Sequence, residues 1–135
     1  MAQPTCFKYF GTSYSTNQFL IGQTAYPVLF FDPCRELIIA INERLPDMTI
    51  MKASVDHSKL ILMGDYGWWT SYAFNDPRHF EWHQREDSHC VAFLDGHADF
   101  IKFTKGQHVA ENYIVLPFDE LIGQAADCQP EDPCP

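Results

Sequence analysis

The chain has 135 residues, of which 46% are hydrophobic and 15% aromatic, and this is enough for a single domain with a buried core. Its 18 acidic and 9 basic residues give a formal net charge of −9. This charge argues against nucleic acid or an anionic membrane surface as a partner, because both require basic patches. No apolar run approaches the roughly 20 residues that span a bilayer, and no signal peptide is evident.

Composition divides the chain into a body and a tail. Residues 1–126 are expected to form one globular domain, and residues 127–135 a Pro- and Cys-rich acidic tail. Residues 1–24 show no regular pattern and are predicted to be irregular. The β-rich run at 25–31 contains a proline, which confines it to an edge strand or a strand start.

The clearest helix is predicted to begin at Pro33, with Asp32 as its N-cap and Pro46 as its stop. Apolar residues recur there at helical spacing and predict one buried face, made of Cys34, Leu37, Ile38, Ile41 and Leu45.

Four further segments complete the predicted secondary structure. Short strands are expected at 49–52, 59–63 and 113–116, and one or two helical turns at 119–126. Residues 66–88 are expected to form a long loop rich in aromatic side chains.

Residues 89–103 predict a central β-hairpin, because Asp95-Gly96 is flanked by alternating apolar runs. Asp followed by Gly suits the two positive φ angles of a type I′ turn, and the Asp95 side chain can bond the backbone two residues further on. A two-residue turn would place Phe93 opposite Ala98. The same register predicts a shared core face made of Val91, Phe93, Ala98 and Phe100.

Three segments of the sequence resemble a known family. Phe93-Leu94-Asp95-Gly96-His97 is similar to the C-terminal signature of a bacterial prepilin-like family, named for a His, nine intervening residues and an Asp-Gly. Ser13-Tyr14-Ser15-Thr16-Asn17 resembles its Ser-Tyr-x-x-Asn segment. Ser58-Lys59-Leu60-Ile61-Leu62-Met63-Gly64-Asp65 resembles its Pro-Ser-Lys, apolar strand and acidic residue. Arg85 stands at the position of the family's histidine, and His83 is the nearest upstream histidine.

The resemblance implies an α+β fold in which an antiparallel sheet packs against one helix, as in the globular head of type IV pilins and type II secretion pseudopilins. It implies a non-enzymatic structural subunit or minor component of a pilus-like or secretion pseudopilus fibre. The partners would be other pilin-like subunits, and the location the bacterial cell envelope, periplasmic or extracellular. The apolar N-terminal helix that anchors such proteins is not in this sequence, and membrane contact would be made only through that missing segment.

Histidines and aspartates gather around the hairpin and the loop before it, and no motif assigns any of them a catalytic role. The candidate metal ligands are Asp65, His83, Asp95, His97 and Asp99. Calcium is the favoured metal, because hard cations take carboxylate and carbonyl oxygens from loops and because major pseudopilins hold calcium in a C-terminal loop. A small metal-dependent hydrolase that uses this His/Asp cluster remains an alternative function.

The aromatic loop and the tail carry the last candidate residues. Trp68, Trp69 and Trp82 would either stack on sugars or anchor a protein partner, as in a carbohydrate- or protein-binding module, or cover the sheet as a lid. In the tail, Cys128 and Cys134 are expected to form a local disulfide.

Overall fold

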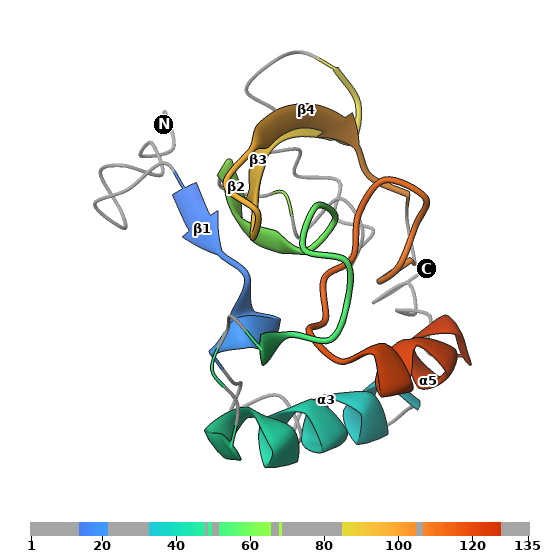
Figure 1. Ribbon diagram of the computed structural model, residues 1–135. Helices are drawn as coiled ribbons and strands as arrows, with labels where there is room; N and C mark the ends of the chain where they lie inside the picture. Colours follow the sequence, from blue (N-terminus) through green and yellow to red (C-terminus); the bar gives the residue numbers. More distant parts are fainter. Residues whose placement is uncertain are drawn as a thin grey trace, which may run out of the picture.

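The fold is α+β, as the sequence predicts, and its four strands form one antiparallel sheet in which the neighbours follow the chain order β1-β2-β3-β4 (Figure 1). The computed structural model describes residues 14–21, 33–47, 49, 52–65, 68, 85–104 and 107–127. The elements are β1 (Tyr14–Thr16), η1 (Gln18–Leu20), α3 (Pro33–Arg44), η2 (Leu45–Asp47), β2 (Ile61–Asp65), β3 (Ser88–Phe93), β4 (Ala98–Lys102), η4 (Asp119–Leu121) and α5 (Ile122–Asp127).

The edge strand β1 lies where the sequence predicts irregular chain. It pairs with β2, with Tyr14 opposite Asp65 and Thr16 opposite Met63. Its three residues show no alternation of apolar and polar side chains, so pairing with β2 rather than local preference makes them a strand. The prediction for residues 1–24 is therefore wrong at this point.

The strands β3 and β4 form the predicted hairpin, but the predicted turn and register are wrong. The Gly96 N–H donates to the Phe93 carbonyl at 3.0 Å, and the Phe93 N–H donates to the His97 carbonyl at 2.9 Å. Gly96 has a φ of +96°, whereas Asp95 is not at positive φ, as a type I′ turn would require. The loop therefore has three residues and ends in a left-handed glycine, the other common hairpin connection.

The longer loop shifts every cross-strand pair by one residue. Ala98 faces Ala92 instead of Phe93, and Phe100 faces Cys90 instead of Val91. A shift of one residue moves a strand's side chains to the opposite face of the sheet. Ala98 and half-buried Phe100 accordingly leave the predicted core face. The buried residues of the hairpin are Ser88, His89, Val91, Phe93, Ile101 and Phe103.

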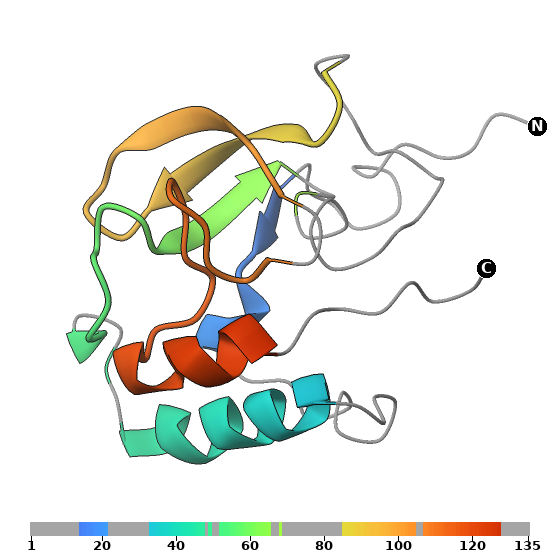
Figure 2. The same ribbon diagram turned by 90° about the vertical axis from the view of Figure 1, so that its right-hand side faces the viewer.

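The helix α3 spans Pro33–Arg44, which confirms the predicted helix and its stop before Pro46. Of the residues of its predicted buried face, Leu37, Ile38 and Ile41 are buried, at 1%, 5% and 1% exposure. The short helix α5 lies beside it, and together they form a helical layer on one side of the molecule, away from β3 and β4 (Figures 1 and 2). At the surface, the Arg44 guanidinium donates to the Glu120 carboxylate at 3.2 Å.

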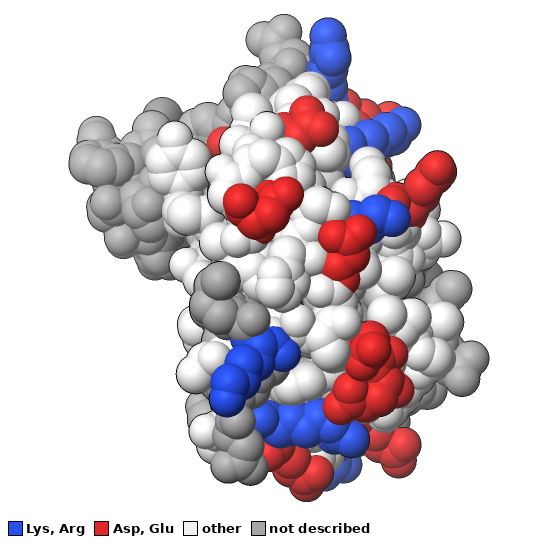
Figure 3. Space-filling view, in the orientation of Figure 1, with Lys and Arg blue, Asp and Glu red and all other residues white. Residues whose placement is uncertain are grey.

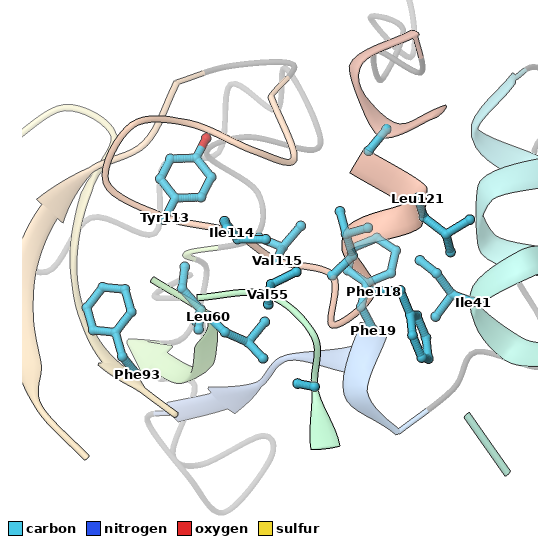
Figure 4. Close-up of a cluster of buried hydrophobic side chains, with 14 of the residues drawn as sticks. Phe19, Ile41, Val55, Leu60, Phe93, Tyr113, Ile114, Val115, Phe118 and Leu121 are labelled. Atoms are coloured by element: carbon cyan, nitrogen blue, oxygen red, sulfur yellow. The ribbon is translucent and has the colours of Figure 1, made fainter. Parts of the chain in front are cut away.

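The segment from Tyr113 to Phe118 crosses the interior between the sheet and the helices, and every residue in it is buried. It makes single bridges, Leu60 with Ile114 and Val109 with Ile114, and not the strand predicted at 113–116. Figure 4 shows Tyr113 and Leu60 on the sheet side of the core and Leu121 on the helix side. One continuous apolar core therefore joins the two layers.

Other predicted elements are only partly covered by the described residues. The strand predicted at 25–31 and most of the loop at 66–88 lie outside them. At 49–52, the Lys52 N–H donates to the Thr49 carbonyl at 2.8 Å, the spacing of a turn and not of a strand. The helix α5 continues to Asp127, the first residue of the predicted tail, and the rest of the tail is not described. None of the described helices is long and apolar enough to cross a membrane.

Candidate functional site

Asn17, the last residue of the first resembling segment, has a fully buried and fully hydrogen-bonded side chain. It has 0% exposure, and its amide nitrogen donates to the Ile61 carbonyl at 2.8 Å and to the Val115 carbonyl at 2.7 Å. Its amide oxygen accepts the Phe19 N–H at 3.1 Å, and its backbone N–H donates to the Leu62 carbonyl at 2.8 Å. One side chain thus joins the end of β1, the start of β2 and the buried segment beneath the sheet.

The tip of the hairpin is hydrogen-bonded to the turn that precedes β2. The Leu94 N–H donates to the Leu60 carbonyl at 2.9 Å, and the Asp95 N–H donates to the His57 carbonyl at 3.1 Å. From the other side, the Ile114 N–H donates to the Lys59 carbonyl at 2.8 Å. The three segments that carry the family resemblance therefore meet around the start of β2. We call this the Asn17 junction: Asn17, the turn at 57–60 and the hairpin tip at 94–95.

The turn that receives the hairpin tip is itself fixed by an aspartate. Asp56 accepts the Ser58 N–H at 2.9 Å and the Ser58 hydroxyl at 2.7 Å through one carboxylate oxygen. The hydrogen bond from the Ser58 hydroxyl is the main cause that lowers the pKa of Asp56 below its usual value. The carboxylate therefore remains ionised and keeps the turn in shape.

Asp95 and His97 are the two predicted metal ligands that the structure brings into direct contact. His97 Nδ1 lies 2.5 Å from Asp95 Oδ1, and the same oxygen accepts the His97 N–H at 3.1 Å. The second bond confirms that Asp95 bonds the backbone two residues further on. The hydrogen bond from the His97 side chain lowers the pKa of Asp95, and the His97 ring stacks on Phe93 with 4.4 Å between the ring centres. The pair is half-exposed.

The other predicted metal ligands do not join this pair. Asp65 accepts the Cys90 N–H at 2.9 Å, and Asp99 accepts the Phe100 N–H at 2.8 Å. Burial, and then the charges of Asp65 and Asp99, raise the pKa of the Cys90 thiol, so both carboxylates lie near Cys90 and not at the hairpin tip.

The described residues include no group of three His, Cys, Asp or Glu side chains close enough to hold a metal ion. The predicted metal set is therefore divided between two places, and its fifth member, His83, lies outside the described residues. A calcium or zinc site remains a prediction.

Trp68 belongs to the core and offers no stacking surface. It is 1% exposed, and its indole N–H donates to the Ser15 carbonyl at 3.1 Å. Gly64 makes room for it, since a Cβ there would lie 3.0 Å from Trp68 Cδ1 and 2.7 Å from Val91 Cγ1. The prediction of Trp68 as a ligand surface is wrong, and its burial fits the alternative in which it covers the sheet. Trp69, Trp82, Cys128 and Cys134 lie outside the described residues.

Two histidines are buried and do not belong to the exposed pair of Asp95 and His97. His89 is 1% exposed and packs near Phe103, with 5.9 Å between the ring centres. His108 is 5% exposed and meets the Phe19 ring edge-on at 5.7 Å. Burial lowers the pKa of His108 to about 4, so the ring is neutral at physiological pH. Nothing in the sequence around His108 signals this environment.

A cavity of about 650 Å³ opens at the base of the hairpin, opposite its tip. We call it the hairpin-base cavity; its lining residues are Asp87, Lys102, Phe103, Thr104, Gln107, Ala110, Glu111 and Asn112. Two of these lining residues are held by the buried Tyr113, whose hydroxyl donates to the Gln107 carbonyl at 2.8 Å and accepts the Thr104 N–H at 3.3 Å. No sequence motif marks these residues as a site, because polar residues at irregular spacing form no recognisable pattern.

Comparison of the chain with protein-family models, with curated proteins and with solved structures finds no match.

Proposed function

We propose that this chain is the globular head of a non-enzymatic structural subunit, or minor component, of a pilus-like or secretion pseudopilus fibre. The observation that supports the proposal best is the Asn17 junction. Three segments, each a weak resemblance by itself, meet there although they are far apart in the sequence. The Asn17 amide binds the Ile61 and Val115 carbonyls, and the hairpin tip binds the carbonyls of His57 and Leu60.

Residues of this kind are what a family based on a shared fold would keep. A buried amide that satisfies backbone groups of two distant segments fixes their relative position, and its loss would leave buried polar groups without partners. The Asp-Gly of the hairpin has a matching role, because Gly96 supplies the positive φ of the loop and Asp95 bonds His97. The resembling segments thus serve architecture, which is consistent with a structural subunit.

The proposal includes partners and a location. Other pilin-like subunits would contact the domain, membrane attachment would come from an N-terminal helix outside this sequence, and the location would be the bacterial cell envelope. On the face that Figure 3 shows, basic side chains lie among acidic ones and form no continuous basic surface. This interspersed charge supports protein partners rather than nucleic acid.

The proposal can be tested on cells that produce the full-length protein. Fibres are sheared from the cell surface, pelleted and viewed by electron microscopy after labelling with gold-conjugated antibody against the purified domain. We expect gold along filaments, and none in the same preparation from cells that lack the gene. Recovery of the protein in the soluble fraction, with filaments that carry no label, would contradict the proposal.

In the alternative function, a metal-dependent hydrolase, the predicted histidines and aspartates would bind a metal ion. Of its predicted His/Asp cluster, Asp95 and His97 lie together at the hairpin tip. A hydrolase would need further ligands beside them, and His83 is the remaining histidine among the candidates. Stoichiometric zinc in the purified protein, lost in His97→Gln, would favour this alternative over the fibre subunit.

A further inference from the structure

The hairpin-base cavity carries opposite charges on one lining. Asp87 and Glu111 contribute carboxylates, and Lys102 contributes an ammonium group. Asp87 is 8% exposed although it is an acidic residue, and its backbone has a φ of +54°. Acidic residues are seldom buried to this extent, and non-glycine residues are uncommon at positive φ. The fold therefore holds Asp87 at the edge of the cavity in an uncommon backbone conformation.

Lys102 and Glu111, which carry opposite charges, do not pair with each other across the cavity. Among the described residues, Arg44 forms an ion pair with Glu120 and His97 contacts Asp95, whereas neither Lys102 nor Glu111 takes part in an ion pair. No carboxylate oxygen of Glu111 thus lies within 4.0 Å of the Lys102 ammonium, although both residues line the cavity. A ligand that carries both signs of charge could meet both at once.

Neutral polar groups complete the lining. Thr104, Gln107 and Asn112 bring one hydroxyl and two amides, which can donate and accept hydrogen bonds. Phe103 and Ala110 add apolar surface to the lining, and the Phe103 ring also packs against Trp68 and Tyr113. A divalent cation is disfavoured by Lys102 and because no group of three metal ligands lies together in the described part of the chain.

The rim of the cavity is preorganised. The Tyr113 hydroxyl ties Thr104 to Gln107, and burial raises the pKa of Tyr113 to about 12, so the hydroxyl keeps its proton. The Ala110 N–H donates to the Tyr113 carbonyl at 2.9 Å and the Val115 N–H to the His108 carbonyl at 3.1 Å. A lining that is already fixed loses less entropy when a ligand binds.

We propose that the hairpin-base cavity binds a small zwitterion, namely a free amino acid or a short peptide with both termini unblocked. The ligand's ammonium group lies toward Glu111, its carboxylate lies toward Lys102, and Gln107 and Asn112 bond its amide or side chain. The volume of about 650 Å³ falls in the range of small-molecule sites. This inference is independent of the fibre proposal, since a fibre subunit and a soluble protein could both hold such a site.

Isothermal titration calorimetry on the full chain tests the proposal, with the standard amino acids and a set of glycyl dipeptides as probes. The probe that binds most tightly is then compared with its N-acetylated and C-amidated forms. We expect each blocked form to bind about tenfold more weakly, because each lacks one of the two charges. If no probe binds at millimolar concentration, or if the blocked forms bind as well as the zwitterion, the proposal is wrong.

Charge variants assign the contacts. Lys102→Met should weaken binding of the zwitterion and abolish the preference for a free carboxylate over an amide, while Glu111→Gln should abolish the preference for a free amine. Lys52→Met and Glu43→Gln are matched controls, because both residues are exposed and lie outside the cavity lining. Binding that survives the cavity variants unchanged, or that the controls weaken equally, would overturn the assignment. Melting temperatures recorded in parallel verify that each variant is folded.

Discussion

The Asn17 junction and the hairpin-base cavity both gather polar groups at one end of the hairpin, yet they use them differently. At the junction the Asn17 amide has 0% exposure and uses both its donors and its acceptor inside the protein. At the cavity the ammonium of Lys102 and the carboxylate of Glu111 are exposed and unpaired within the described structure. The first arrangement fixes the fold, and the second leaves interactions open to a ligand.

The difference shows which residues a substitution should affect and how. Removal of a satisfied buried group leaves its partners without hydrogen bonds and lowers the free energy of unfolding. Removal of an exposed polar group costs little stability and changes only what the surface can bind. Stability and ligand affinity should therefore respond to different residues.

The largest effect is expected from Asn17→Ala. The change leaves the Ile61 and Val115 carbonyls and the Phe19 N–H without this partner, at about 1–3 kcal/mol for each buried group that stays unsatisfied. We expect the free energy of unfolding, measured by urea denaturation, to fall by at least about 3 kcal/mol. Asn112→Ala is the matched control and should change it by less than about 0.5 kcal/mol, because Asn112 is exposed. Equal effects of the two variants would remove the contrast between the regions.

The next effect is a pH dependence that comes from His108, which packs on Phe19 beside the junction. Burial lowers its pKa from 6.5 to about 4 in the folded state, so the unfolded state binds the extra proton between these values. Stability is full above about pH 6.5 and falls as the pH drops to about 4, by at most about 3 kcal/mol from this group. In His108→Phe, the loss of stability over that pH range should be smaller than in the wild type. Identical pH profiles would show that folding does not lower the pKa of His108.

A smaller loss of stability is expected from Gly64→Ala, which tests the packing of Trp68 on the sheet. The new Cβ would lie 2.7 Å from Val91 Cγ1 and 3.0 Å from both the Cys90 carbonyl oxygen and Trp68 Cδ1. Overpacking of this kind costs about 1–3 kcal/mol, which thermal unfolding would detect. Gly123→Ala is the control, since a Cβ there meets nothing within 4 Å and alanine favours the helix α5. A neutral Gly64→Ala would mean that Trp68 does not pack against β2.

The smallest effect is expected from Gly96→Ala at the hairpin tip. No atom lies within 4 Å of the new Cβ, so only the φ of +96° opposes it. We expect a loss of about 1 kcal/mol in the free energy of unfolding, the usual order of cost for a side chain in this region. Affinity for a zwitterion at the hairpin base should not change. An unchanged stability would show that the loop can rearrange without a positive φ.

The parts of the fold that local signals determine could be predicted from the sequence. Pro33 and Pro46 bracket α3, and the apolar spacing between them identifies its buried face. The apolar run before Gly64 predicts β2 to within two residues. The Asp-Gly pair predicts the hairpin and the bond from Asp95 to the His97 backbone. In each case the determining residues are neighbours in sequence.

The register of the hairpin and both polar regions could not be predicted in this way. Asp-Gly suits a two-residue and a three-residue loop alike, and the choice between them moved Ala98 and Phe100 off the core face. The bonds of Asn17 reach Val115, and the lining of the cavity combines the start of β3, the end of β4 and the loop at 107–112. Contacts between segments so far apart depend on the tertiary fold, and single-sequence patterns do not contain them.

The contrast between the two regions is tested most directly by nuclear magnetic resonance of the ¹⁵N-labelled chain, titrated with the amino acid or dipeptide that binds most tightly. We predict that amide shifts change at the cavity, at Asp87, Lys102, Thr104, Gln107, Glu111 and Asn112. The amides around the Asn17 junction should keep their positions, at Asn17, Phe19, Leu62 and Val115. Shifts confined to the junction, or no shifts anywhere at millimolar ligand, would contradict the division of the molecule into a structural junction and a binding cavity.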